Sequence, residues 1–231
     1  MKPSLILFIL LSVFSVGTSQ TIPIYKAADK PVIDGDLSEW KRPFLGPFVV
    51  HNSGVKATQK NVVSLSWNNE NLYIAFRSDD SKIIGSYQQH DSQIYKTDDL
   101  VEIFIDPDGD GLQYVEIGIN AFSTYYDMLI ACALPACGGW KASMDFKVVG
   151  METASKITPE GFCVEIKIPF SALENSISTN FKTPTIGTKW KGNVFRIDFG
   201  KTTEYLALQH YSTSEFGFHQ PSEFAVFEFV E

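Results

Sequence analysis

The chain has few cysteines, no cluster of basic residues and no long hydrophobic run beyond its N-terminus. Among 231 residues there are 3 Cys, 19 Lys or Arg and 27 Asp or Glu, which gives a net charge of −8. Nucleic-acid binding requires a concentrated positive face, so this composition excludes a nucleic-acid partner. No later segment approaches the length needed to cross a bilayer, so we expect no membrane span in the mature chain.

Common catalytic and cofactor motifs are also missing from the sequence. It contains no nucleophile elbow and no glycine-rich phosphate loop. It has no Cys-x-x-Cys pair of the kind that binds zinc, and no Cys-x-x-Cys-His for covalent haem attachment. We therefore expect a non-catalytic protein without an organic cofactor.

The first 19 residues have the features of an export signal. Lys2 supplies a positive end, Leu5–Val16 supplies an apolar stretch, and small residues precede a predicted cut before Gln20. We expect a secreted or periplasmic protein in which residues 20–231 form a single domain.

The cysteines allow one short loop to be closed in such an oxidising compartment. Cys132 and Cys137 flank a segment that contains proline and precedes two glycines, which favours a turn and a disulfide between them. Cys163 would then be a buried free thiol on a strand. The alternative is three packed thiols, because cysteine also behaves as a small hydrophobic residue.

Alternation of apolar and polar residues dominates the chain and predicts short strands with one face in a core. The predicted strands are Val62–Trp67, Leu72–Arg77, Leu100–Asp106, Gln113–Asn120, Phe162–Ile168, Val194–Phe199 and Phe224–Val230. One short helix is predicted at Pro169–Glu174, and residues 20–30 are expected to lead into the domain as an extended segment. This pattern predicts an all-β fold, an antiparallel β-sandwich of the immunoglobulin or jelly-roll kind, with a closed barrel as the alternative.

An ordered series of segments runs along the chain. The segments are Ile33–Trp40 (IDGDLSEW), Leu72–Phe76 (LYIAF), Asp99–Asp106 (DLVEIFID), Tyr114–Asn120 (YVEIGIN) and Phe218–Phe224 (FHQPSEF). In this order they resemble the family 9 carbohydrate-binding modules and their relatives in the DOMON-like β-sandwich group. The resemblance covers essentially the whole mature chain. It implies a sugar-binding β-sandwich that serves polysaccharide degradation, with structural calcium in characterised members.

The resemblance also implies where a sugar would bind. Two aromatic rings enclose a terminal sugar in the family, and Phe218 stands at the second of these positions. A gapless match places Lys96 at the first position and Tyr95 one residue earlier, although neighbouring residues on a strand face opposite ways. Neither family tryptophan is present at these positions, and Gly118 stands where the family has an arginine.

Polar groups for the sugar hydroxyls are implied by the same matching. These are Asp80, Glu102 and Glu215, while Tyr211 and Trp140 are further possible stacking rings. The alternative for the rings is packing in the core or at its rim, and for Glu102 it is an ordinary solvated carboxylate on an amphipathic strand.

An acidic turn offers a candidate calcium site. Asp106, Asp108 and Asp110 alternate ahead of Gly111, as in the first half of a calcium loop. Position 12 of an EF-hand would be Ile117 rather than glutamate, so the full motif is absent. The alternative is an acidic hairpin turn, where Asp and Gly are favoured in any case.

Two other classes of function remain open. Some DOMON-like relatives hold a b-type haem through His or Met ligands, and the chain offers both residue types. A glycoside hydrolase would need two carboxyl groups flanking a bond, for which Asp98, Asp99 and Glu102 are available. The leading hypothesis is a glycan-binding protein, and the length of the chain leaves us expecting any hydrolase it assists to be a separate secreted chain.

Overall fold

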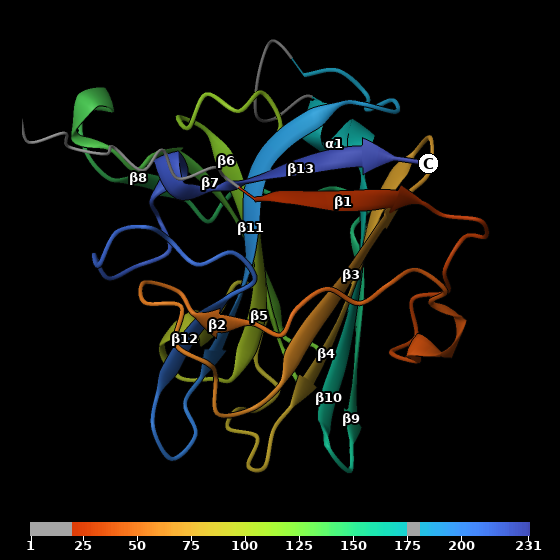
Figure 1. Ribbon diagram of the computed structural model, residues 1–231, viewed down its shortest axis with the longest axis vertical. Coiled ribbons are helices and arrows are strands. Elements are labelled where there is room, and N and C mark those ends of the chain that lie inside the picture. The colour runs from red at the N-terminus through yellow and green to blue at the C-terminus, as the bar shows by residue number, and fades with distance from the viewer. Residues whose placement is uncertain (1–19, 175–180) are drawn as a thin grey trace, which may run out of the picture.

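The computed structural model describes residues 20–174 and 181–231, so the predicted export signal lies outside the described residues (Figure 1). Strands dominate this part of the chain, with one short helix, α1 (Phe170–Glu174). The strands are β1 (Thr21–Lys26), β2 (Val49–Val50), β3 (Asn61–Trp67), β4 (Asn71–Asp79), β5 (Leu100–Asp106), β6 (Tyr114–Asn120), β7 (Tyr125–Cys132), β8 (Lys141–Ser143), β9 (Glu152–Thr158), β10 (Gly161–Pro169), β11 (Lys189–Asp198), β12 (Glu204–Ala207) and β13 (Ala225–Val230). Short 3-10 turns η1 (Leu37–Glu39), η2 (Ile94–Lys96), η3 (Pro135–Cys137) and η4 (Pro221–Glu223) lie in the connections.

The strands form the two layers of a β-sandwich. Hydrogen bonding follows the order β8-β7-β6-β5-β11-β13-β1-β3-β4-β10-β9, with β12 beside β11 and β2 beside β12. The long strand β11 joins the layers, because its first residues pair with β13 and its last residues pair with β12. Strand β1 runs parallel to both of its neighbours, β13 and β3, whereas the other strand pairs are antiparallel.

Each residue of β5 is buried, but its two faces meet different surroundings. Val101, Ile103 and Ile105 point into the core between the two layers. Leu100 and Phe104 belong to a second apolar cluster on the outer face of the same sheet, together with rings from β6, β7 and β11. Connecting segments cover this outer face, and the candidate functional site lies there.

The predicted strands and the predicted short helix are all present. Residues 20–30 were expected only to lead into the domain as an extended segment. Strand β1 within them is instead an interior strand of the sandwich, paired on both sides. The sequence pattern also missed β7 and β9. Strand β9 is largely exposed and pairs only with β10 in the described chain, so its residues need no apolar alternation.

Hydrogen bonds define one tight turn, and the third cysteine lies where the sequence predicted it. Asn68 closes the β3–β4 hairpin, since its Oδ1 accepts hydrogen bonds from the backbone amides of Glu70 and Asn71 at 2.9 and 2.8 Å. Cys163 lies on β10 as a buried free thiol. No helix within residues 20–174 and 181–231 combines the length and apolar character needed to cross a membrane.

Candidate functional site

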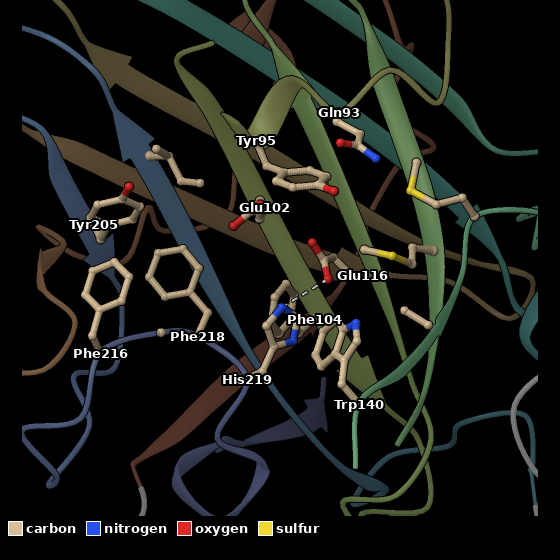
Figure 2. Close-up of a pocket in the computed structure, with 15 residues that line it drawn as sticks. Gln93, Tyr95, Glu102, Phe104, Glu116, Trp140, Tyr205, Phe216, Phe218 and His219 are labelled. Carbon is tan, nitrogen blue, oxygen red and sulfur yellow. Dashed lines mark ion pairs between the residues drawn. The ribbon is translucent and has the colours of Figure 1, made fainter. Parts of the chain in front are cut away.

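A cavity of about 420 Å³ opens on the outer face of the β5–β6–β7–β11 sheet (Figure 2). The strands supply its floor, and segments far apart in the sequence supply its walls. Its lining residues are Gln93, Tyr95, Glu102, Phe104, Glu116, Met128, Trp140, Ala142, Met144, Ile197, Tyr205, Phe216, Gly217, Phe218 and His219.

Strand register brings two carboxyl groups together in the floor. Glu102 on β5 lies opposite Gly118 on β6, and Gly118 lies opposite Tyr126 on β7. The Tyr126 hydroxyl contacts Oε1 of Glu102 at 2.6 Å and Oε1 of Glu116 at 2.7 Å. Because Gly118 has no side chain, the Tyr126 ring can pass directly over its backbone toward the two carboxyls.

Burial changes the acidity of this pair. It raises the pKa of Glu102 to about 7, although the hydrogen bond from Tyr126 opposes the shift. It also raises the pKa of Glu116 well above its usual value, with the charge of Glu102 acting in the same direction. Protonated carboxyl groups are therefore favoured in the folded protein near neutral pH.

This shift predicts that the folded protein loses stability as pH rises. A carboxyl group whose pKa is higher in the folded state binds more protons when the protein is folded than when it is unfolded. Its contribution to the free energy of unfolding is therefore fully present below the unfolded pKa and is lost as the pH rises from about 4.5 to 7. We expect the free energy of urea unfolding to fall from pH 5 to pH 8. Glu102→Gln should reduce that fall by on the order of 1–2 kcal/mol.

The exposed Glu70 provides a matched control for this titration. Glu70→Gln should leave the pH dependence unchanged. An identical fall in wild type and in Glu102→Gln would show that Glu102 titrates normally.

Aromatic rings form the walls of the cavity. Phe218 is 8% exposed and stacks on Phe195, with ring centroids 4.1 Å apart and an interplanar angle of 16°. Phe216 is 70% exposed and meets the Tyr205 ring edge to face at 4.8 Å. Trp140 is 54% exposed, and Figure 2 shows it across the cavity from Phe216. Phe216 and Trp140 therefore present ring surface at the mouth of the cavity.

His219 connects the wall to the floor. Its ring stacks on Phe104 and its Nδ1 lies 2.9 Å from the Tyr114 hydroxyl. Its Nε2 lies 3.6 Å from Glu116 Oε2, the pair marked by the dashed line in Figure 2. Burial lowers the pKa of His219 to about 4, so the imidazole is neutral at neutral pH.

The structure brings four of the seven predicted binding residues into this cavity, namely Tyr95, Glu102, Trp140 and Phe218. Tyr95 lies on the 3-10 turn η2 rather than on a strand, so the alternating directions of strand side chains do not apply there. The Tyr95 side chain lines the cavity, but Lys96 is not among the lining residues. The Nζ of Lys96 instead lies 5.7 Å from the centroid of the Tyr95 ring.

The other three predicted binding residues lie outside the cavity lining. Tyr211 is buried behind the wall, where its hydroxyl donates to the backbone carbonyl of Phe218 at 2.6 Å. Glu215 is exposed on the segment before Phe216. Asp80 is buried in an ion pair with Arg196 and lines a different hollow. A binding role for each of the seven residues stays a prediction.

Sequence reasoning missed Glu116, His219, Tyr205 and Phe216. Glu116 faces the same side of the sheet as Glu102, and the alternation of Tyr114, Glu116 and Gly118 in β6 was a usable signal for it. Phe216 and His219 lie on the connection between β12 and β13, and the path of this connection brings them to the cavity. The path of a connecting segment cannot be predicted from the alternation of apolar and polar residues.

The carboxylates proposed for hydrolysis do not form a pair across the cavity. Asp98 Oδ2 accepts a hydrogen bond from Asn120 Nδ2 at 2.8 Å, and Asp99 Oδ1 accepts one from the Phe199 amide at 2.6 Å. Neither residue is among those lining the cavity.

The acidic turn between β5 and β6 lies apart from the cavity lining. Carboxylate oxygens of Asp106, Asp108 and Asp110 all lie within 4.8 Å of one another, a donor set that suits a hard cation such as calcium. Both oxygens of Asp106 also accept backbone hydrogen bonds, from Gly109 and Gly111 at 2.9 Å each, as expected for an acidic turn. Calcium binding here stays a prediction.

The loop after β7 carries a cystine. Cys132 and Cys137 form a disulfide with an S–S distance of 2.04 Å. The loop leads through η3 to Trp140, so the cystine lies on the segment that supplies one wall of the cavity.

Three solved structures resemble the whole sandwich. A candidate carbohydrate-binding protein from Bacteroides uniformis superposes with a TM-score of 0.72 at 15% identity, covering 92% of this chain and 100% of that one. A family 9 carbohydrate-binding module from Caldicellulosiruptor kristjanssonii in complex with glucose gives 0.63 at 19% identity, covering 90% of this chain and 95% of that one. The same module in complex with cellotriose gives 0.64 at 18% identity, with 91% and 94% covered. At these identities the likeness shows the fold.

Sequence comparison reaches the same group of proteins. Endo-1,4-beta-xylanase A of Thermoanaerobacterium saccharolyticum is 28% identical over an alignment of 157 residues that covers 64% of this chain and only 12% of the xylanase. The family model described as carbohydrate family 9 binding domain-like matches residues 39–229. The chain belongs to the carbohydrate family 9 binding domain-like proteins.

Proposed function

We propose that the protein is a non-catalytic carbohydrate-binding protein and that the cavity on the outer face of the β5–β6–β7–β11 sheet holds the sugar. The observation that carries this proposal is the pairing of buried carboxyl groups in the floor with exposed aromatic rings at the mouth. A pyranose presents apolar C–H faces and a rim of hydroxyls, which need flat rings and hydrogen-bonding groups respectively. A solved member of the family binds glucose and cellotriose, which supports the same ligand class here.

The biological setting is part of the proposal. The predicted export signal favours action outside the cytoplasm, where glycans are accessible. The match to part of a xylanase suggests that binding assists the degradation of polysaccharide by a separate hydrolase. In the family that the chain belongs to, two aromatic rings enclose a terminal sugar, which favours the end of a glycan chain over its middle.

Calorimetric titration with glucose, cellotriose and xylotriose tests the proposal. Replacing Phe216 or Trp140 by alanine removes ring surface at the mouth, so we expect the affinity to fall by about tenfold to a hundredfold in each variant. Both side chains are largely exposed, so folding should be unaffected.

Tyr87 provides the control for these variants, since it is 74% exposed and does not line the cavity. Tyr87→Ala should bind like the wild type. Absence of binding heat with every sugar, or an equal loss in Tyr87→Ala, would contradict the proposal.

A further inference from the structure

The floor of the cavity holds two carboxyl groups whose hydrogen bonding is incomplete. Oε1 of Glu102 and Oε1 of Glu116 each contact Tyr126, but neither Oε2 has a hydrogen-bond partner among the described residues. The two residues are 2% and 3% exposed. A buried oxygen without a donor is costly, so a ligand that supplies donors gains binding free energy there.

The protons in this cluster can be counted from its geometry. The Tyr126 hydroxyl carries one proton and can donate it to only one carboxylate. The second short oxygen–oxygen contact needs a proton from the carboxyl group itself. At least one of Glu102 and Glu116 is therefore a neutral carboxylic acid in the free protein, which agrees with the raised pKa values of both groups.

No permanent positive charge balances these groups. The cavity lining includes no lysine or arginine. His219 approaches Glu116 but is neutral at neutral pH, because burial lowers its pKa to about 4. The cavity lining therefore offers two carboxyl groups that can ionise and no cation to balance them.

Aromatic rings surround the two carboxyls. Figure 2 shows Phe216 and Phe218 on one side, Trp140 on the other, and Tyr95 beyond the carboxyls. Ring faces attract cations as well as the apolar faces of sugars, and the attraction strengthens where water is excluded. Carboxylates surrounded by aromatic rings can bind a ligand that combines a cationic group, held by the carboxylates, with a flat apolar ring face, held by the aromatic rings.

We infer that the cavity selects an amino sugar, with its ammonium group at Glu102 and Glu116 and its pyranose ring among the aromatic rings. This inference rests on the proposed function. An ammonium group has three donors, enough to reach both free Oε2 atoms. Binding ionises the pair: each carboxylic acid that ionises gives its proton to the buffer, and no covalent bond of the sugar changes.

The pH dependence follows from the groups around the pair. Burial holds the tyrosines that face it neutral by raising their pKa values, and it keeps His219 neutral down to about pH 4. These tyrosines are Tyr95, Tyr114, Tyr126 and Tyr211. Glu102, whose pKa burial raises to about 7, is therefore the group in this cluster that loses its proton as the pH approaches 7, so affinity for an amino sugar should rise between pH 5 and 7.

Calorimetric titration with glucosamine, N-acetylglucosamine, glucose and choline tests the inference with the full-length protein. At pH 6.5 we expect glucosamine to bind at least about tenfold more tightly than glucose or N-acetylglucosamine. The glucosamine heat should vary with the ionisation enthalpy of the buffer, because protons are released, whereas the glucose heat should not. Lowering the pH to 5 should shrink the preference.

Glu116→Gln separates the charge from the shape of the site. In this variant glucosamine and glucose should bind with affinities within about threefold of each other, because the preference for the ammonium group is lost. Urea unfolding of the variant shows separately that it folds. The exposed Glu70→Gln should keep the preference. Equal binding of glucose and glucosamine would overturn this inference and leave the proposed function standing, and choline binding as tight as glucosamine would also overturn it. No binding of any sugar would overturn both.

Discussion

Replacing Gly118 by alanine is expected to destabilise the protein by about 3 kcal/mol and to abolish ligand binding in the cavity. A Cβ at this position would lie 2.4 Å from Tyr126 Cε1 and 2.6 Å from its Cζ. The ring is completely buried and its hydroxyl is held between Glu102 and Glu116, so it cannot move aside without breaking both contacts. Urea unfolding measures the loss of stability.

Two further variants test whether that clash is the cause. Tyr126→Ala removes the ring, so the double variant with Gly118→Ala should be destabilised by clearly less than the sum of the two single changes. Gly139→Ala is the control, since its Cβ would meet nothing within 4 Å and its positive φ of 84° costs only about 1 kcal/mol. Strict additivity of Gly118→Ala and Tyr126→Ala would contradict the proposed packing.

Replacing Arg196 by methionine is expected to cost about 3–5 kcal/mol of stability. Arg196 is completely buried on β11, with its Nη2 2.6 Å from Asp80 Oδ2 and 3.6 Å from Asp198 Oδ2. Its charge also favours the ionised form of nearby Asp99, whose pKa burial raises to about 6. Methionine fills much of the same space but leaves these carboxylates without a cation.

The charge, rather than the volume, should account for this loss. Adding Asp80→Asn to Arg196→Met should recover part of the stability in urea unfolding, because one uncompensated carboxylate is removed. Lys156→Met is the control: it breaks an ion pair with Asp36 at 3.1 Å between half-exposed side chains, where water screens the charges and the pair contributes little to stability. A cost for Arg196→Met as small as that of the control would contradict this interpretation.

The sequence predicted the sandwich because its central strands alternate strictly. Val101, Ile103 and Ile105 face one core, and the residues between them face the other side of the sheet. Strand β1 was not recognised because Ile22 and Ile24 alone supply its alternation, on either side of a proline, and its burial is caused by its neighbours β13 and β3.

The candidate site could be predicted only in part. Glu102 and Phe218 lie in ordered segments that the resemblance identified, and both line the cavity. The contact of Glu102 with Glu116 through Tyr126 depends on the register of three strands and on the missing side chain of Gly118. Such a contact is a property of the assembled sheet, so the pattern within any one segment does not contain it.

The indole resonances of the four tryptophans test the central claim most directly. Trp40, Trp67 and Trp190 are buried away from the cavity, and Trp140 alone among them lines it. Nitrogen-15 NMR spectra recorded during titration with glucose, glucosamine, cellotriose and xylotriose should show the Trp140 indole peak moving to saturation with at least one sugar while the other three stay in place. A Trp140 peak that remains fixed at every sugar concentration would contradict the account.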